Sequence, residues 1–329
     1  MCLTLNFMVV IMGVKQELWE YFMNHTTGRR SLKGAVHGII AFTMDVDEEI
    51  LDLILKRLKR SEITFGESSG AYFDYSRKQL HFPYKISPMH RTTALHEMGH
   101  AVDFISCDRI EKRINANSTR TIFKEHYTTG EYILSNGKTL DKTVREELKV
   151  NGARIYSELL SRFNSEVLDK LGSDVAENYL TVNAKLISDD TAKHRYRVPY
   201  QTIASYRENK AKVDAMYALR NSMALPYDER FRLFESRRAV TDSAEYRAFC
   251  DRYDTLIDMI SGVENTRYLW PGHSRSYMKR KGGFGVEFFA DVFSSTATRN
   301  TTDLNLVAEW LPNSYAGFEE VLLHLKTAA

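Results

Sequence analysis

The chain has 329 residues, of which 43% are hydrophobic and 27% charged, and its formal net charge is +2. This composition is typical of a globular protein with room for two lobes, and so weak a charge gives no reason to expect nucleic acid as a partner. The three cysteines, at positions 2, 107 and 250, form no C-x-x-C pair, and none is spaced to join a histidine in a metal site. So low and odd a count predicts a reducing compartment, which favours the cytoplasm, or simply incidental thiols.

The first 14 residues are apolar, but they lack a basic segment and are too short to span a bilayer. A buried strand, or a start misplaced ahead of Met8 or Met12, accounts for them better than a signal peptide does. Secretion stays open as an alternative. No other stretch is long and apolar enough to cross a membrane, so we expect no membrane contact.

The segments ahead of residue 83 predict a helix and a small sheet. A helix is expected from Asp45, which can cap it, to Arg60, with acidic residues at its start and basic residues at its end. A strand at 63–65 and a turn should follow. The runs 71–75 and 78–82 then predict a hairpin. A hairpin in this position could align an extended peptide along its edge, or it could be purely structural.

The next segment, Thr93–Val102, reads T-A-L-H-E-M-G-H-A-V and contains H-E-x-x-H. On a helix His96 and His100 share one face, where two imidazoles can bind one metal ion, and Glu97 can reach a water on that ion. The alternative is an exposed helix that happens to carry these residues. The residues around the motif are apolar on most faces of the helix, so we expect the helix to be buried. A buried set of two histidines and a glutamate needs a partner, such as Zn2+.

From residue 143 the sequence predicts mostly helix. Thr143 and Glu146 form a capping box at the start of a first run, which ends at Gly172. Further runs are expected at about 205–225 and 243–260, and the polar stretch 188–197 should separate the first two. We expect an N-terminal lobe over 1–142, a helical insertion over 143–262 and a C-terminal lobe over 263–329.

A catalytic zinc ion needs a third protein ligand. In G-V-E-F-F-A-D-V-F-S, over 285–294, Glu287 and Asp291 stand at i and i+4 of an otherwise apolar helix. Buried carboxylates are compensated if one faces a metal ion and the other a ligand imidazole. We therefore expect Glu287 to be the ligand and Asp291 to pair with His96.

Four residues rival Glu287 as the third ligand: Asp103, seven residues after His96, and His126, His194 and His273. Asp103 lacks the longer motif of aspartate-type zincins, and an outward or supporting carboxylate is the simpler interpretation. Each of the three histidines is more simply interpreted as an ordinary histidine without a metal.

Two segments, T-A-L-H-E-M-G-H-A-V-D and G-V-E-F-F-A-D-V-F-S, resemble the gluzincin domain of the anthrax lethal factor type, which includes Pro-Pro endopeptidases. The run 258–262, with 272–277, also resembles metallopeptidase-like domains of bacteriophage minor head (head morphogenesis) proteins. The resemblance covers the H-E-x-x-H helix and roughly residues 254–296. It implies His96, His100 and Glu287 as zinc ligands, Glu97 as general base and Asp291 as the carboxylate behind a ligand.

Enzymes of the lethal factor type also place a tyrosine about two turns before the ligand glutamate to stabilise the oxyanion. This chain has Arg280 near that point, and its nearest tyrosine is Tyr277. Tyr277 and His273 therefore both stand as candidates for that role.

We expect an α+β, mostly helical fold with a zincin-like catalytic core, in which a small sheet and an edge-strand hairpin precede the H-E-x-x-H helix. The expected function is a zinc-dependent peptide hydrolase acting on a peptide or protein substrate. The alternative is a phage head-morphogenesis component, bound to other phage structural proteins, whose zinc site is structural and leaves no open position for water.

Overall fold

The computed structural model describes residues 2–26, 43, 45–68, 70–75, 77–83, 92–103, 133–195, 210, 211, 214, 215, 218, 224–264, 266, 268–280 and 282–327. The chain is mostly helical with one three-stranded sheet, which confirms the α+β, mostly helical class. None of the described helices is long and apolar enough to cross a membrane.

The chain forms two compact units. Unit 1 comprises Met1–Ile155, Arg252–Glu264 and His273–Ala329, and unit 2 comprises Tyr156–Asp251 and Asn265–Gly272. The sequence had suggested boundaries at 142/143 and 262/263, whereas the units divide within a long helix and interleave along the chain. Every residue predicted to hold the metal ion belongs to unit 1.

The N-terminal segment is helical, so the prediction of a buried strand there is wrong. Helix α1 covers Cys2–Asn24, because the apolar start continues into good helix formers with buried side chains at Leu18, Tyr21 and Phe22, spaced i, i+3 and i+4. It packs against α3 (Glu48–Ser61), where the Tyr21 hydroxyl donates to the carbonyl of Leu58 at 2.7 Å.

The N-cap of helix α3 lies two residues later than predicted. Its N-cap is Asp47 rather than Asp45, and the Asp47 carboxylate accepts the N–H of Glu49 at 3.0 Å. At the other end Glu62 takes a left-handed conformation, with φ at 54°, and stops the helix as a C-cap does.

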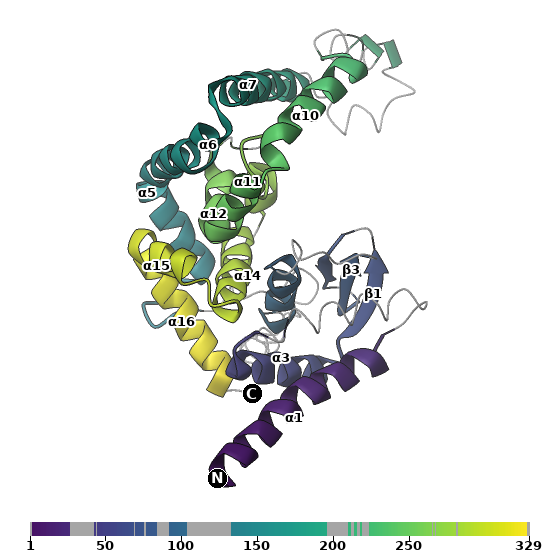
Figure 1. Ribbon diagram of the computed structural model, residues 1–329, viewed down its shortest axis with the longest axis vertical. Coiled ribbons are helices and arrows are strands. Elements are labelled where there is room, and N and C mark those ends of the chain that lie inside the picture. Colours follow the sequence, from purple (N-terminus) through teal and green to yellow (C-terminus); the bar gives the residue numbers. More distant parts are fainter. Residues whose placement is uncertain are drawn as a thin grey trace. The chain divides into compact units, whose positions relative to one another are not determined.

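The sheet contains β1 (Thr64–Ser68), β2 (Tyr72–Asp74) and β3 (Gln79–Pro83) in the order β1-β3-β2. Figure 1 shows β1 and β3 side by side. The antiparallel pairing of β2 with β3 confirms the predicted hairpin, whereas β1, parallel to β3, extends into residues predicted as a turn. The row Phe65, Leu80 and Phe73 is buried on one face. Strand β2 lies at an edge of the sheet.

The predicted H-E-x-x-H helix is confirmed over 92–103; its expected last residues lie outside the described part. It packs closely on α14 (Gly283–Ala297): a Cβ on Gly99 would stand 2.9 Å from the Cα of Ala290. The Ser294 hydroxyl also donates to the carbonyl of Thr92 at 3.0 Å. Helix α12 (Asp254–Val263) lies beside α14 (Figure 1).

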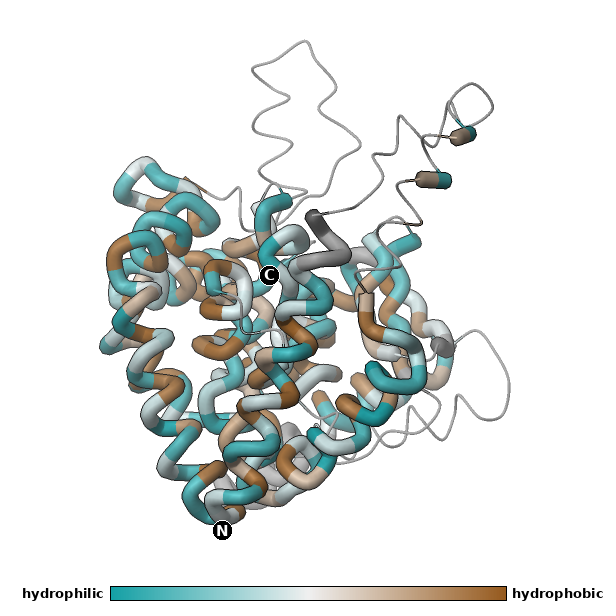
Figure 2. Tube along the Cα trace, turned by 90° about the horizontal axis from the view of Figure 1, so that it is seen from above, coloured by the Kyte–Doolittle hydropathy of each residue, from teal (hydrophilic) through white to brown (hydrophobic). Residues whose placement is uncertain are grey.

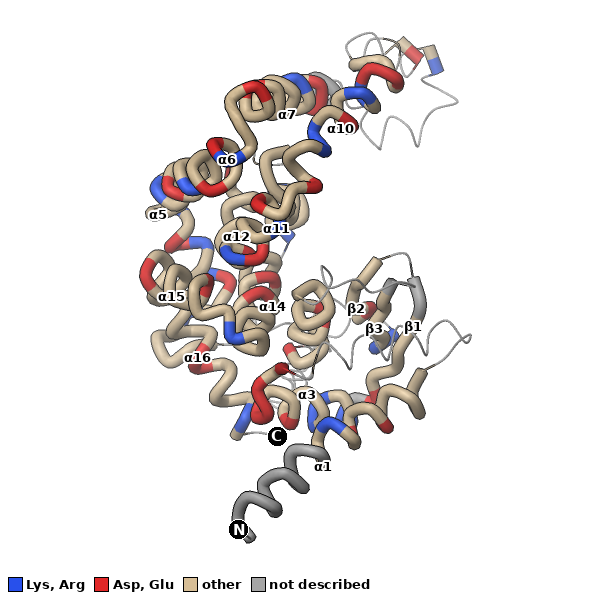
Figure 3. The backbone as a smooth tube through the Cα atoms, in the orientation of Figure 1, with Lys and Arg blue, Asp and Glu red and all other residues tan. Residues whose placement is uncertain are grey.

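Helix α14 is buried along nearly its whole length. Glu287 and Asp291 are its only charged residues, and it is otherwise tan in Figure 3. By contrast α10 (Tyr227–Thr241) of unit 2 carries interleaved acidic and basic residues. Two buried carboxylates in so apolar a helix call for specific partners.

The helical region begins earlier than the predicted capping box. Helix α5 covers Leu140–Phe163, and it is the Thr139 side chain that accepts the N–H of Lys142, while Thr143 donates to the carbonyl of Thr139. A π-helical turn (Asn164–Leu168) and α6 (Asp169–Leu171) carry the run to Gly172, as predicted.

Two other predictions for this region are corrected. Helix α7 (Ser173–Arg195) runs through most of the polar stretch that was expected to separate two helices. The run expected at 243–260 is two helices, α11 (Ala244–Arg252) and α12, which meet at Tyr253. The run expected at 205–225 lies almost entirely outside the described residues.

The C-terminal part adds three helices that the sequence did not predict: α13 (Arg275–Met278), α15 (Thr301–Trp310) and α16 (Pro312–Thr327). The Glu147 carboxylate caps α16 by accepting the N–H groups of Asn313 and Ser314, at 2.9 and 2.8 Å. Along single helices hydrophobic and hydrophilic positions alternate (Figure 2), the pattern of amphipathic helices around a core.

Candidate metal centre

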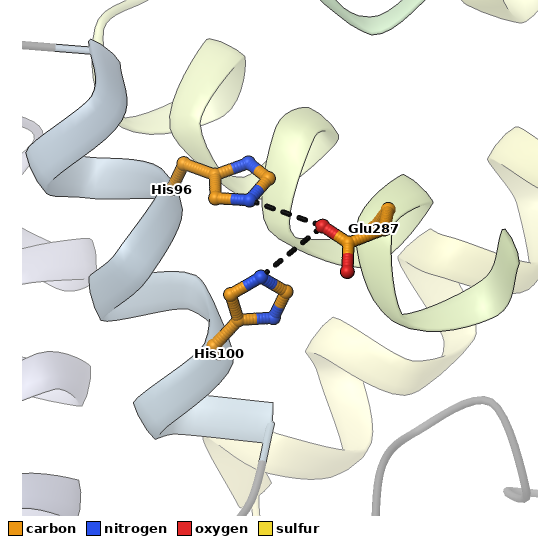
Figure 4. Close-up of side chains that lie close together, drawn as sticks. All are labelled: His96, His100 and Glu287. Atoms are coloured by element: carbon orange, nitrogen blue, oxygen red, sulfur yellow. Dashed lines mark ion pairs between the residues drawn. The ribbon is translucent and has the colours of Figure 1, made fainter. Parts of the chain in front are cut away.

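Three side chains from two helices meet at one carboxylate oxygen. The Nε2 atoms of His96 and His100 each lie 3.3 Å from Oε2 of Glu287 (Figure 4). The histidines come from the helix over 92–103 and the glutamate from α14, which is held against it by the Gly99–Ala290 contact. The structure thus brings together the three residues that the sequence singled out as ligands, although 187 positions separate His100 from Glu287.

Two of the three distances between ligand atoms, both 3.3 Å, match those of a tetrahedral zinc site, and all three atoms lie within 4.8 Å of one another. With bonds of about 2.05 Å, ligand atoms at the corners of a tetrahedron stand about 3.3 Å apart. Glu287 is 0% exposed, and its Oε2 makes no hydrogen bond with any residue that the structure describes. A buried carboxylate oxygen without a hydrogen bond is costly. A metal ion between this oxygen and the two imidazoles would offset that cost, so these residues fit zinc.

The charged groups of the centre shift one another's pKa values. Burial alone would raise the pKa of Glu287, but the imidazoles of His100 and His96 hold it well below its usual range. Burial alone would lower the pKa of His96, yet the Asp291 carboxylate raises it well above the ordinary value. The anionic glutamate is therefore the favoured form, which is the form that binds a cation.

Asp291 lies behind His96, one helical turn after Glu287. Its Oδ1 is 2.6 Å from Nδ1 of His96, so the other ring nitrogen, Nε2, faces Glu287. Carboxylates in this position fix the tautomer of a ligand histidine and increase its basicity. This is the arrangement that the i, i+4 spacing predicted for the pair of carboxylates.

Glu97 lies between the helix and the sheet. Its Oε2 accepts the backbone N–H of Phe73 at 2.8 Å, so the edge strand β2 holds the carboxylate of the H-E-x-x-H motif. The ring of Phe73 packs into the core edge-on to Tyr75, whose ring is 6.2 Å from that of His100. The predicted hairpin therefore contacts the site directly.

The opposite wall contains His273 and Asp258. The backbone N–H and Nδ1 of His273 donate to Asp258, with Nδ1 2.9 Å from Oδ2, and Nε2 remains for another partner. The rings of His273 and His96 are 6.3 Å apart. Burial would lower the pKa of His273, but Asp258 raises it above the ordinary value.

Tyr277 and Arg280 hold the second oxygen of the ligand glutamate. The Tyr277 hydroxyl lies 3.0 Å from Oε1 of Glu287, and the Arg280 guanidinium donates to the same atom. Tyr277 also stacks on His273, with ring centroids 4.3 Å apart. Sequence reasoning missed the contact of Arg280 and the role of Asp258; the one available signal for Asp258 was a carboxylate in the apolar run of α12.

Asp258, His273 and Glu287 form a second group whose atoms lie at ligand distance. However, Arg280 and Tyr277 occupy Oε1 of Glu287, and His273 engages both oxygens of Asp258. A guanidinium on the shared carboxylate opposes a second cation. We therefore treat Asp258 as the residue that orients His273, and not as a metal ligand.

Two of the rival ligands whose side chains the structure describes, Asp103 and His273, do not join the first group. Asp103 is buried at the last described position of its helix, and the two candidate ligand groups found among the described residues do not contain it. His194 lies on α7 of unit 2, and His126 lies outside the described residues.

Comparisons with known proteins add no relative. No family model matches the chain, no curated protein matches it, and no solved structure matches it. The function must therefore be argued from the centre itself.

Proposed function

We propose that the protein is a zinc-dependent peptide hydrolase of the gluzincin type, built on a zincin-like core. The observation that carries the proposal is the placement of His96, His100 and a buried Glu287 at zinc-ligand spacing, with the glutamate of H-E-x-x-H beside them. Three described residues would hold the ion, which is the number of protein ligands that leaves a position for water in catalytic zinc sites.

When bound, zinc would supply a Lewis acid that activates water and polarises a peptide carbonyl. The Glu97 carboxylate accepts the proton of the attacking water and delivers it to the leaving amine. The N–H of Phe73 keeps that carboxylate at the edge of β2, where an extended substrate can add as a further strand.

His273 suits the oxyanion role better than Tyr277. Asp258 accepts from Nδ1 of His273 and, against the effect of burial, raises the pKa of His273. The imidazolium favoured in this way carries an Nε2–H that can donate to the negative oxygen of the tetrahedral state. The hydroxyl of Tyr277 is already directed at Glu287, so Tyr277 serves to position that ligand. Asp258 is the positioning residue for His273.

The test measures zinc and peptide cleavage in parallel. We expect near one zinc per chain in the wild type and in Glu97→Gln, because Glu97 does not ligate the ion, and loss of zinc in Glu287→Ala. Cleavage of a degenerate peptide mixture, followed by mass spectrometry, should fall by about 10²–10⁴-fold in Glu97→Gln, which lacks the proton acceptor.

The matched control is Glu309→Gln, the same substitution at an exposed carboxylate of α15. Zinc retained in full by Glu287→Ala would contradict the ligand set. A zinc-loaded wild type that cleaves nothing would instead support the structural alternative, a zinc-stabilised phage structural component.

A further inference from the structure

One wall of the centre is strongly basic. From His273 to Val286 the sequence contains four lysines and arginines and no aspartate or glutamate, although the whole chain has a net charge of only +2. Arg275, Lys279 and Arg280 are exposed in the structure. This wall is part of the site, because His273, Tyr277 and Arg280 all belong to it and two of them contact Glu287 through Oε1.

Arg280 is held in place more firmly than a surface arginine usually is. Its Cζ lies 3.8 Å from the centroid of the Tyr277 ring, and its carbonyl oxygen accepts hydrogen bonds from Arg145 and from the N–H of Gly283, both at 3.0 Å. A guanidinium that is already ordered loses little entropy when it binds a ligand.

Arg280 also has donors to spare. It uses Nη2 for Glu287, its side chain is 41% exposed, and its Nε and Nη1 donate to none of the described residues. Among the described residues its carboxylate partner is Glu287, whose charge a bound divalent ion would share. With zinc in place Arg280 would therefore be under-neutralised, which favours a further anion beside it.

We propose that Arg280 is an anion subsite that binds a carboxylate of the peptide substrate, so that the hydrolase selects acidic peptides. This inference rests on the proposed function. The planar guanidinium binds carboxylates through two parallel hydrogen bonds, and the second N–H of Nη2, beside the one directed at Glu287, can provide them together with Nη1 or Nε. Because Arg280 contacts a ligand of the ion and an extended residue spans about 3.3 Å, the carboxylate belongs within about two residues of the cleaved bond.

Two sources can supply this carboxylate: an aspartate or glutamate side chain, or the C-terminus of the substrate. Four peptide sets separate them, with an acidic or a neutral residue near the cleaved bond and with a free or an amidated C-terminus. Preference for acidic residues in amidated peptides identifies the side chain. Preference for free over amidated neutral peptides identifies the terminus.

The experiment compares kcat and KM of the zinc-loaded wild type, Arg280→Gln and Arg280→Lys on these sets. Arg280→Gln keeps an N–H donor for Glu287 but removes the charge. Since charge-assisted hydrogen bonds are lost, we expect the wild-type preference for carboxylate-bearing peptides, in kcat/KM, to fall by about tenfold to a hundredfold, mainly through KM. Arg280→Lys should restore part of it.

Arg247→Gln is the matched control, an identical substitution at an exposed arginine of α11 in unit 2, and should keep the preference. Zinc content is measured for every variant. If Arg280→Gln lowered kcat equally on acidic and neutral peptides, Arg280 would act only on Glu287 or on the oxyanion, and the anion subsite would be wrong.

Failure of the proposed function is a separate outcome. If the zinc-loaded wild type cleaves no peptide, hydrolysis fails, but binding of fluorescein-labelled acidic peptides to Glu97→Gln still tests the subsite by fluorescence anisotropy. Loss of that binding in the double variant with Arg280→Gln supports the subsite. Equal binding of acidic and neutral peptides overturns it.

Discussion

At the scale of single residues, Asp303 shows how a buried carboxylate is accommodated away from the metal centre. It is 0% exposed on α15, and its Oδ2 accepts the hydroxyls of Thr255 on α12 and Ser295 on α14, both at 2.6 Å. Its Oδ1 is buried without a hydrogen-bond partner among the described residues. Burial raises the pKa of Asp303 to about 6, despite these two donors.

A pH-dependent stability follows. The pKa of Asp303 is higher in the folded state than the usual value of about 3.9. The protonated carboxyl therefore stabilises the folded state in full below about pH 4, and this stabilisation is lost as pH rises through 6. Between pH 4 and pH 7 we expect the wild type to lose roughly 3 kcal/mol of unfolding free energy relative to Asp303→Asn, which does not titrate at this position. Urea titrations of the metal-free proteins measure it. A difference independent of pH would contradict the raised pKa.

The partners of some buried carboxylates could be predicted from the sequence, and those of others could not. Glu287 and Asp291 stand in one apolar helix at a spacing that pairs them with the two histidines. Asp258 and Asp303 gave no such pattern. The partner of Asp258, His273, lies in the segment ahead of α13, and the partners of Asp303, Thr255 and Ser295, are set by how α12, α14 and α15 pack. The hydrogen-bond partner of a lone carboxylate is a tertiary property.

At the scale of elements, the contact between the H-E-x-x-H helix and α14 determines whether the ligands meet. Gly99 lies three residues after His96 and one before His100, and its Cα faces Ala290, which lies between Glu287 and Asp291. The two smallest residue types thus stand where the helices come closest. Any larger side chain there would separate the imidazoles from the carboxylate.

Gly99→Ala should therefore weaken both stability and zinc binding. The added Cβ would meet the Cα of Ala290 at 2.9 Å, backbone that cannot rotate away, so we expect a loss of about 1–3 kcal/mol in unfolding free energy and a lower zinc affinity. Chemical denaturation and competition with a chromogenic chelator measure the two effects.

Gly152→Ala on α5 is the control for that substitution. Its nearest neighbour would be Val263 Cγ2 at 3.6 Å, an ordinary contact, so the better helix former should raise stability by about 0.5–1 kcal/mol. Equal behaviour of the two alanine variants would mean that the Gly99–Ala290 contact does not limit the packing of the helices.

At the scale of the whole molecule, all three ligands belong to unit 1, which gathers them from segments on both sides of unit 2 in the sequence. Unit 2 has its own core, in which Val182, Leu186 and Tyr268 are buried together. A ligand that binds only the folded form of one unit stabilises that unit.

Zinc removal should therefore affect the two units unequally. At a free zinc concentration of a thousand times Kd the ion adds about 4 kcal/mol, which for a unit of this size corresponds to roughly 8–16 °C in melting temperature. In differential scanning calorimetry we expect a chelator to lower the transition of unit 1 and leave that of unit 2 in place. Glu287→Ala should show no further change with chelator. Equal shifts of both transitions would contradict a zinc site confined to unit 1.

The sequence alone determined the local parts of this protein. Hydrophobic periodicity and H-E-x-x-H identified the helix over 92–103, alternation identified the β2–β3 hairpin, and i, i+4 spacing identified Glu287 and Asp291, because each signal spans a few neighbouring residues. Where a signal was local but ambiguous it failed: the apolar N-terminus is a helix rather than a strand, and the true caps are Asp47 and Thr139.

Only the tertiary structure decided which distant residues share the centre. The carbonyl of Arg280 is fixed by Arg145, 135 positions away, and Glu97 meets the N–H of Phe73 across the edge of the sheet. The two units likewise interleave along the chain. Such contacts depend on packing between elements, and no spacing within one element encodes them. That is why the ligands and Asp291 could be predicted from the sequence, whereas the contacts of Asp258 with His273 and of Arg280 with Glu287 could not.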